Sequence, residues 1–105
     1  MDQIRITTQT LLVLEHFVSK PSVSIHGFEI IDATDLQSGT VYPVLARLER
    51  AGWLSSEWDT DPDARGARRR LYRVTPDGLA SARYELAKAR ATADGAFRLR
   101  PGWAT

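Results

Sequence analysis

Residues 38–54, SGTVYPVLARLERAGWL, constrain the fold of this chain more than any other segment. The apolar residues of this segment recur at the spacing of one helix face, and they are Val41, Val44, Leu45 and Leu48. Gly52 follows where a left-handed residue commonly ends a helix, and Trp53 to Trp58 has the composition of a strand. The segment therefore predicts a short helix, fixed at both ends, that leads directly into a β-ribbon.

The other face of this helix is polar, and it differs in chemistry from an ordinary solvated face. Its side chains, with Ser38 at the start of the first turn, are Thr40, Tyr42, Arg47 and Arg50. Hydroxyls and guanidiniums suit the base edges and phosphates of DNA, so the helix and ribbon are typical of a recognition helix and its wing. In the alternative interpretation these side chains are structural: Ser38 and Thr40 cap the helix, and Tyr42 packs against the rest of the protein. Arg47 can likewise contact phosphate or pair with Glu49 or Glu29.

The rest of the chain divides into short elements around this helix. We expect helices over about 7–19, 27–33 and 76–93, a linker over 21–25, and wing strands over 53–58 and 68–74. The predicted fold class is α+β, mostly α: a winged helix-turn-helix with a two-stranded wing and a C-terminal dimerisation helix. Residues 1–94 form one domain in this interpretation, and residues 95–105 form a tail after the Asp94-Gly95 helix end.

The wing concentrates charge of both signs. Residues 37–74 hold seven Arg against five acidic residues, whereas residues 1–36 hold two basic residues against five acidic ones. Four arginines of the wing are candidates for contacts with the DNA backbone or minor groove: Arg65, Arg68, Arg69 and Arg70. The same arginines can instead neutralise Asp59, Asp61 and Asp63 across the hairpin.

The last predicted helix carries a narrow seam of small and medium apolar side chains. The seam consists of Leu79, Ala82, Leu86 and Ala89. Such a seam can pack on its own domain or on a second chain, and we expect the second arrangement, a homodimer. A two-fold dimer would read symmetric half-sites one helical turn apart.

Several function classes have no support in the sequence. His16 and His26 are isolated, cysteine is absent, and no nucleophile motif or glycine-rich phosphate loop occurs. We therefore expect no catalytic residues, no metal and no cofactor. The chain has neither an apolar run near 18 residues nor the pattern of a signal peptide, so we expect a cytoplasmic protein without membrane contact.

From about Gly27 to Ala82 the sequence resembles the PadR-like winged-helix transcriptional regulators. The resemblance is carried by His26-Gly27-Phe28-Glu29-Ile30, Ser38 to Pro43, Arg47-Leu48-Glu49, Ala51 to Leu54, Glu57-Trp58, Arg68 to Thr75 and Gly78. It implies a homodimeric repressor of double-stranded operator DNA, in which the last helix packs on the partner's first helix through Leu11 and Leu14. It also implies a possible small aromatic effector near that interface. The alternative is a winged-helix module that binds another protein instead of DNA, which the acidic wing keeps open.

Overall fold

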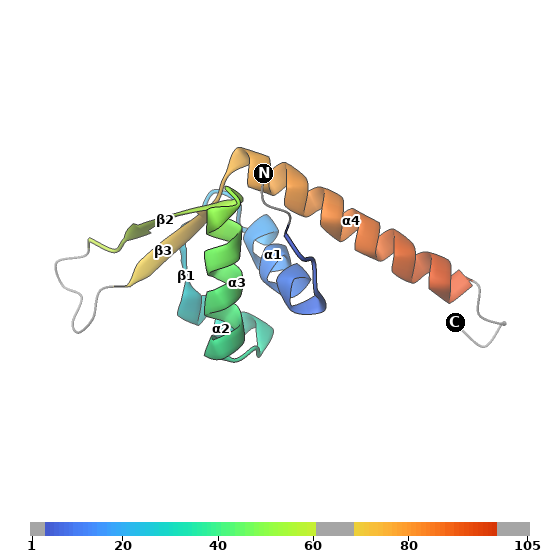
Figure 1. The fold of residues 1–105 in the computed structure, drawn as a ribbon, viewed down its shortest axis with the longest axis horizontal. Coiled ribbons are helices and arrows are strands. Elements are labelled where there is room, and N and C mark those ends of the chain that lie inside the picture. The colour runs from blue at the N-terminus through green and yellow to red at the C-terminus, as the bar shows by residue number, and fades with distance from the viewer. Residues whose placement is uncertain (1–3, 61–68, 99–105) are drawn as a thin grey trace.

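The computed structural model of the chain describes residues 4–60 and 69–98. Within these residues, four helices and a three-stranded antiparallel sheet form a mostly helical α+β body, from which the last helix runs outward (Figure 1). In chain order the elements are α1 (Thr8–Ser19), β1 (Ile25–His26), α2 (Gly27–Thr34), α3 (Ser38–Arg50), β2 (Leu54–Trp58), β3 (Arg70–Val74) and α4 (Pro76–Arg98). The predicted winged helix-turn-helix order is confirmed.

The α3 helix begins and ends close to its predicted limits. The backbone N–H of Val41 donates to the Gln37 carbonyl over 3.0 Å, and Gln37 is the N-cap residue. Gly52 has a φ of 83°, the left-handed conformation that ends the helix. The four predicted apolar residues of α3 are all buried. Each contributes roughly 1.5–3 kcal/mol by leaving water, so the inner face of α3 is fixed while its outer face remains available.

The sheet contains one strand that we did not predict. β1 pairs with β3 in the order β1-β3-β2, with Ile25 opposite Tyr72, and Leu54 in β2 lies opposite Val74. We expected residues 21–25 to be a linker, and this prediction is wrong for Ile25, which belongs to β1. A strand of two residues is too short to show alternation, and its partner lies far along the chain, so local sequence does not reveal it.

The start of α4 at Pro76 matches the helix predicted over about 76–93. The Gly78 backbone N–H donates to the Thr75 hydroxyl oxygen over 2.9 Å, so Thr75 caps the helix. The Thr75 hydroxyl itself donates to the Gly52 carbonyl over 2.7 Å. A Cβ at Gly78 would lie 2.1 Å from the Trp53 carbonyl oxygen. The start of α4 is therefore packed directly on the backbone that joins α3 to β2.

The end of α4 differs from the prediction. The helix continues to Arg98, whereas we expected it to end at Ala93 before Asp94-Gly95. A glycine inside a helix costs only about 1 kcal/mol relative to alanine, and the alanine-rich sequence around it favours the helix. Residues 95–98 thus belong to α4 rather than to a tail, and residues 99–105 lie outside the described residues. Although α4 has 23 residues, neither it nor another described helix is apolar enough to cross a membrane.

Three of the six predicted dimerisation residues are buried within the single chain. Helix α4 lies against α1, and Leu14 and Ala82 are completely buried, while Leu86 is 7% exposed. Leu11, Leu79 and Ala89 are half-buried. The structure thus places much of the seam on its own domain, the arrangement that we did not favour. Leu14 and Ala82 have no surface left for a second chain in this arrangement, and dimerisation through α1 and α4 stays a prediction.

Candidate nucleic-acid interface

The first turn of α3 is open to solvent. Ser38 is exposed, Thr40 is half-buried and the Tyr42 side chain is 45% exposed. The N-cap residue Gln37 makes no side-chain capping hydrogen bond, and the structure records no cap from Ser38 or Thr40 either. The N–H groups at this helix start therefore resemble those that bind phosphate in other proteins. The capping role that we considered for Ser38 and Thr40 has no support in this geometry.

Tyr42 lies across the start of α2 because residue 27 has no side chain. A Cβ at Gly27 would lie 2.5 Å from Cε1 of the Tyr42 ring and 2.9 Å from its hydroxyl oxygen. Gly27 therefore determines where the Tyr42 ring rests. In the sequence Gly27 stands out only as part of the longer motif around His26, which does not indicate this role.

Arg70 is held by three contacts at the base of the wing. Its Nη2 lies 3.1 Å from Glu49 Oε2, its Nε donates to the Ser56 hydroxyl over 2.9 Å, and its guanidinium lies 5.4 Å from the Trp58 ring centroid. The Ser56 hydroxyl also donates to Glu49. Hydrogen bonds from Ser56, followed by those from Arg70 and its positive charge, lower the pKa of Glu49 below 4.5. Arg70 thus joins β3 to α3, in addition to any contact with phosphate.

The two acids that we considered as partners for Arg47 are both bound to other cations. Glu49 pairs with Arg70, and Glu29 pairs with Lys20. Arg47 is exposed on α3 and has no ion pair with a described residue. This arrangement favours the phosphate-facing alternative for Arg47 over the internal ion pair.

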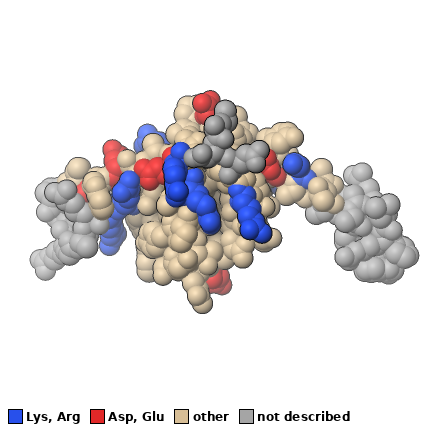
Figure 2. Space-filling view, viewed as in Figure 1, with Lys and Arg blue, Asp and Glu red and all other residues tan. Residues whose placement is uncertain are grey.

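The structure describes only some of the remaining charged residues of the wing. Arg69 is exposed, and its carbonyl accepts a 2.7 Å hydrogen bond from the Asp59 backbone N–H. Arg65 and Arg68 lie outside the described residues, as do Asp61 and Asp63. Figure 2 shows basic side chains over the wing strands and the middle of the body, with acidic groups between them. The described part of this face is therefore mixed in charge rather than uniformly basic.

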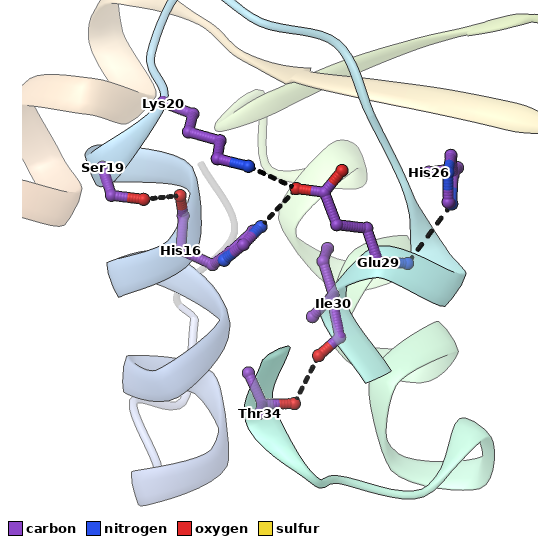
Figure 3. Close-up of polar contacts among 7 residues, drawn as sticks. All are labelled: His16, Ser19, Lys20, His26, Glu29, Ile30 and Thr34. Atoms are coloured by element: carbon purple, nitrogen blue, oxygen red, sulfur yellow. Dashed lines mark hydrogen bonds and ion pairs between the residues drawn. The ribbon is translucent and has the colours of Figure 1, made fainter. Parts of the chain in front are cut away.

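A polar cluster between α1 and α2 fixes the first half of the helix-turn-helix unit. His16 Nε2 lies 2.7 Å and Lys20 Nζ 3.0 Å from Glu29 Oε2, and the three side chains converge from both helices (Figure 3). The His16 hydrogen bond, followed by that from Lys20, lowers the pKa of Glu29 below 4.5. His26 accepts the Glu29 backbone N–H at Nδ1 over 3.2 Å and so caps α2. His16 and His26 thus both have structural roles here.

Tyr42 and the wing line one shared pocket. A partly open pocket of about 570 Å³ is lined by Tyr42 from α3, by Trp58 and Arg70 from the wing strands, and by Arg69. The start of the recognition-type helix and the base of the wing therefore lie on the same side of the molecule.

A sequence profile described as the transcriptional regulator PadR-like family matches residues 22–84. The chain belongs to the PadR-like family. It is accordingly a transcriptional regulator and not an enzyme.

Solved structures of regulators have the same fold. A PadR family transcription regulator from Clostridium difficile R20291 is 22% identical, with a TM-score of 0.70 over 84% of this chain and 93% of that one. The PcaV transcriptional regulator from Streptomyces coelicolor, solved with its natural ligand, is 28% identical, with a TM-score of 0.71 over 88% of this chain and 60% of that one. BpsR from Bordetella bronchiseptica is 22% identical, with a TM-score of 0.72 over 95% of this chain and 67% of that one. DNA binding by BpsR is regulated by 6-hydroxynicotinic acid. No curated protein sequence matches significantly.

Proposed function

We propose that this PadR-like regulator is a sequence-specific DNA-binding repressor that acts as a homodimer in the cytoplasm. One observation carries the proposal: Tyr42 of α3 and Arg69 at the wing base border the same pocket, so both elements can approach one duplex. The first turn of α3, with Ser38, Thr40 and Tyr42, would enter the major groove. The wing would follow the adjacent backbone through Arg69, together with Arg65 and Arg68.

The contribution of Arg70 differs from that of the other wing arginines in this proposal. Its charge is partly neutralised by Glu49 at 3.1 Å, so its contact with phosphate would be weaker than that of an unpaired arginine. We assign Arg70 the role of positioning the wing relative to α3. Arg47, which is exposed on α3 and unpaired among the described residues, takes a phosphate contact instead.

The dimer of this proposal uses the outer surfaces of α1 and α4. Tyr84 is 65% exposed on α4 and Leu12 is 38% exposed on α1, although both are large apolar side chains. Exposed apolar side chains on a long projecting helix favour contact with a second chain. Leu11 and Ala89, which are half-buried, would contribute at the edge of that contact.

We also propose that a small effector regulates DNA binding by this protein. The PcaV structure contains a natural ligand, and 6-hydroxynicotinic acid regulates DNA binding by BpsR. Both proteins share the fold of this chain, which supports ligand response here.

The test is a fluorescence anisotropy titration with the promoter region of the protein's own gene, repeated over a range of salt concentrations. If each subunit neutralises about four phosphates, a dimer neutralises about eight. The logarithm of the DNA affinity should then fall against the logarithm of the salt concentration with a slope near −7. Arg69→Ala should weaken binding and reduce the slope, whereas Arg83→Ala on α4, away from the proposed contact, should change neither. Binding that is absent, or present without salt dependence, would instead favour a module that recognises another protein.

A further inference from the structure

The pocket between α2, α3 and the wing strands is lined largely by aromatic rings. Its volume is about 570 Å³, and the rings are Phe28 from α2, Tyr42 from α3, Trp58 from β2 and Tyr72 from β3. Tyr72 is almost completely buried, whereas Phe28 is 68% and Trp58 50% exposed. A large apolar ring gains free energy when it leaves water. A partner that covers this pocket would therefore gain most from offering it an apolar surface.

The position of the pocket determines which part of a bound duplex would cover it. In the proposed complex the first turn of α3 enters the major groove, and Arg69 at the wing base contacts the adjacent backbone. Tyr42 of that first turn and Arg69 both line the pocket. A sugar-phosphate strand forms the wall between the two grooves of a duplex. The strand that joins the two contacts would therefore cross the pocket.

The chemistry of such a strand alternates between phosphate and sugar. Phosphates need cations and N–H donors, which Arg69 supplies and Phe28 does not. Base pairs in a duplex are stacked on one another, and stacking of bases on protein rings is typical of single strands. The faces of deoxyribose present carbon and hydrogen, and the sugar lacks the 2′-hydroxyl of ribose. The exposed rings therefore match the sugars better than the phosphates or the base faces.

We propose that this pocket receives the deoxyribose sugars of one DNA strand, with Phe28 and Trp58 packed against them and Arg69 on a neighbouring phosphate. The inference rests on the proposed function, because it needs a bound duplex. An apolar contact releases no counterions, so it adds affinity that salt does not remove. It also adds the same affinity on every DNA sequence, because all sequences share these sugars.

Fluorescence anisotropy tests the proposal, with the promoter duplex and a scrambled duplex of the same length and composition, each at several salt concentrations. Phe28→Ala should weaken binding to both duplexes roughly fivefold, the loss expected when one ring is no longer partly buried. The slope of log affinity against log salt should not change. Arg69→Ala should make this slope shallower, because a phosphate contact is lost. Val23→Ala is the matched control, since Val23 is 49% exposed but does not line the pocket.

Two further replacements separate an apolar contact from a general loss of structure. Phe28→Leu keeps an apolar side chain and should retain most of the affinity, whereas Phe28→Gln should lose as much as Phe28→Ala. Because Phe28 is exposed on the single chain, all three replacements should leave the fold intact, which circular dichroism verifies.

A promoter duplex with deoxyuridine in place of thymine separates the sugars from the thymine methyl groups, which are the apolar part of the base edges. The loss in Phe28→Ala should be the same on this duplex, because its sugars are unchanged. Three results would overturn the proposal: a loss that disappears with deoxyuridine, a loss confined to the promoter, or no loss in Phe28→Ala. The proposed function would survive each of them. Absence of salt-dependent binding to either duplex would instead contradict the proposed function itself, and this inference with it.

Discussion

The Arg70 guanidinium lies 3.1 Å from the Glu49 carboxylate, and this ion pair ties the second wing strand to the C-terminal half of α3. The Ser56 hydroxyl, on the first wing strand, bonds to both residues. One small polar cluster therefore sets the angle between the two elements that we propose to contact DNA.

Glu49→Ala distinguishes a positioning role for Arg70 from a direct phosphate contact. Removal of a negative charge near DNA should strengthen binding if Arg70 acts only through phosphate. If the pair positions the wing, Glu49→Ala and Arg70→Ala should each weaken DNA binding, by roughly two- to fivefold as for a partly exposed ion pair. A double-mutant cycle measured by anisotropy should show that the two losses are not additive. Tighter binding by Glu49→Ala would contradict the positioning role.

The cluster of Glu29 with His16 and Lys20 should make the stability of the chain depend on acid pH. The pKa of Glu29 is lowered in the folded state, so its contribution to stability is complete above about pH 4.5 and is lost as pH falls through the folded pKa. Urea unfolding at neutral pH and at about pH 3 measures how much free energy of unfolding is lost in acid. This loss should be smaller in Glu29→Gln than in the unmodified chain. Glu15→Gln, on the exposed face of α1, is the matched control. An equal acid-induced loss in Glu29→Gln and the unmodified chain would contradict the prediction.

Gly78 and Gly39 should respond oppositely to alanine. A Cβ at Gly78 would lie 2.1 Å from the Trp53 carbonyl oxygen, which is backbone and has no rotamer to move away, so we expect a loss of about 2–3 kcal/mol. At Gly39 a Cβ has nothing within 4 Å, and alanine should stabilise α3 by up to about 1 kcal/mol. Thermal unfolding of the two variants measures the difference. A stable Gly78→Ala would show that α4 can shift away from the α3–β2 connection.

The local elements were predictable from the sequence because the signals that determine them are local. The buried stripe of α3, the left-handed Gly52 and the start of the last helix at residue 76 each depend on residues a few positions apart, and all three are confirmed. β1 was missed because its pairing with β3 joins distant parts of the chain. The end of α4 was misplaced because Gly95 weakens a helix without stopping it.

The site was predictable in its residue types but not in its partners. Hydroxyls on α3 and arginines in the wing indicated the surface, yet the sequence does not show which acid Arg70 pairs with. Glu49 is 21 residues away from it and belongs to another element. The contact between Tyr42 and Gly27 depends on the relative placement of two helices, which spacing within either helix does not specify.

Gly27→Ala should affect DNA binding more than it affects folding. The new Cβ would lie 2.5 Å from Cε1 of Tyr42, but the ring is 45% exposed and can swing outward. We expect a change in the free energy of unfolding of less than about 1 kcal/mol, together with weaker promoter binding. Tyr42→Ala should cause a similar loss, and the double variant should lose little more than either single one. Fully additive losses would show that Gly27 does not act through Tyr42.

Tyr84 and Leu86 separate the proposed dimer contact from the internal packing of α4. Tyr84 is 65% exposed and Leu86 only 7%, although the two residues lie on the same helix turn. Tyr84→Asp should keep the unfolding temperature but shift sedimentation towards the monomer, because a charge would enter an apolar interface. Leu86→Asp should lower the unfolding temperature instead, because it buries a charge against α1. A Tyr84→Asp chain that sediments as the unmodified protein does would exclude this face of α4 from the dimer, since the ring is 65% exposed on the single chain.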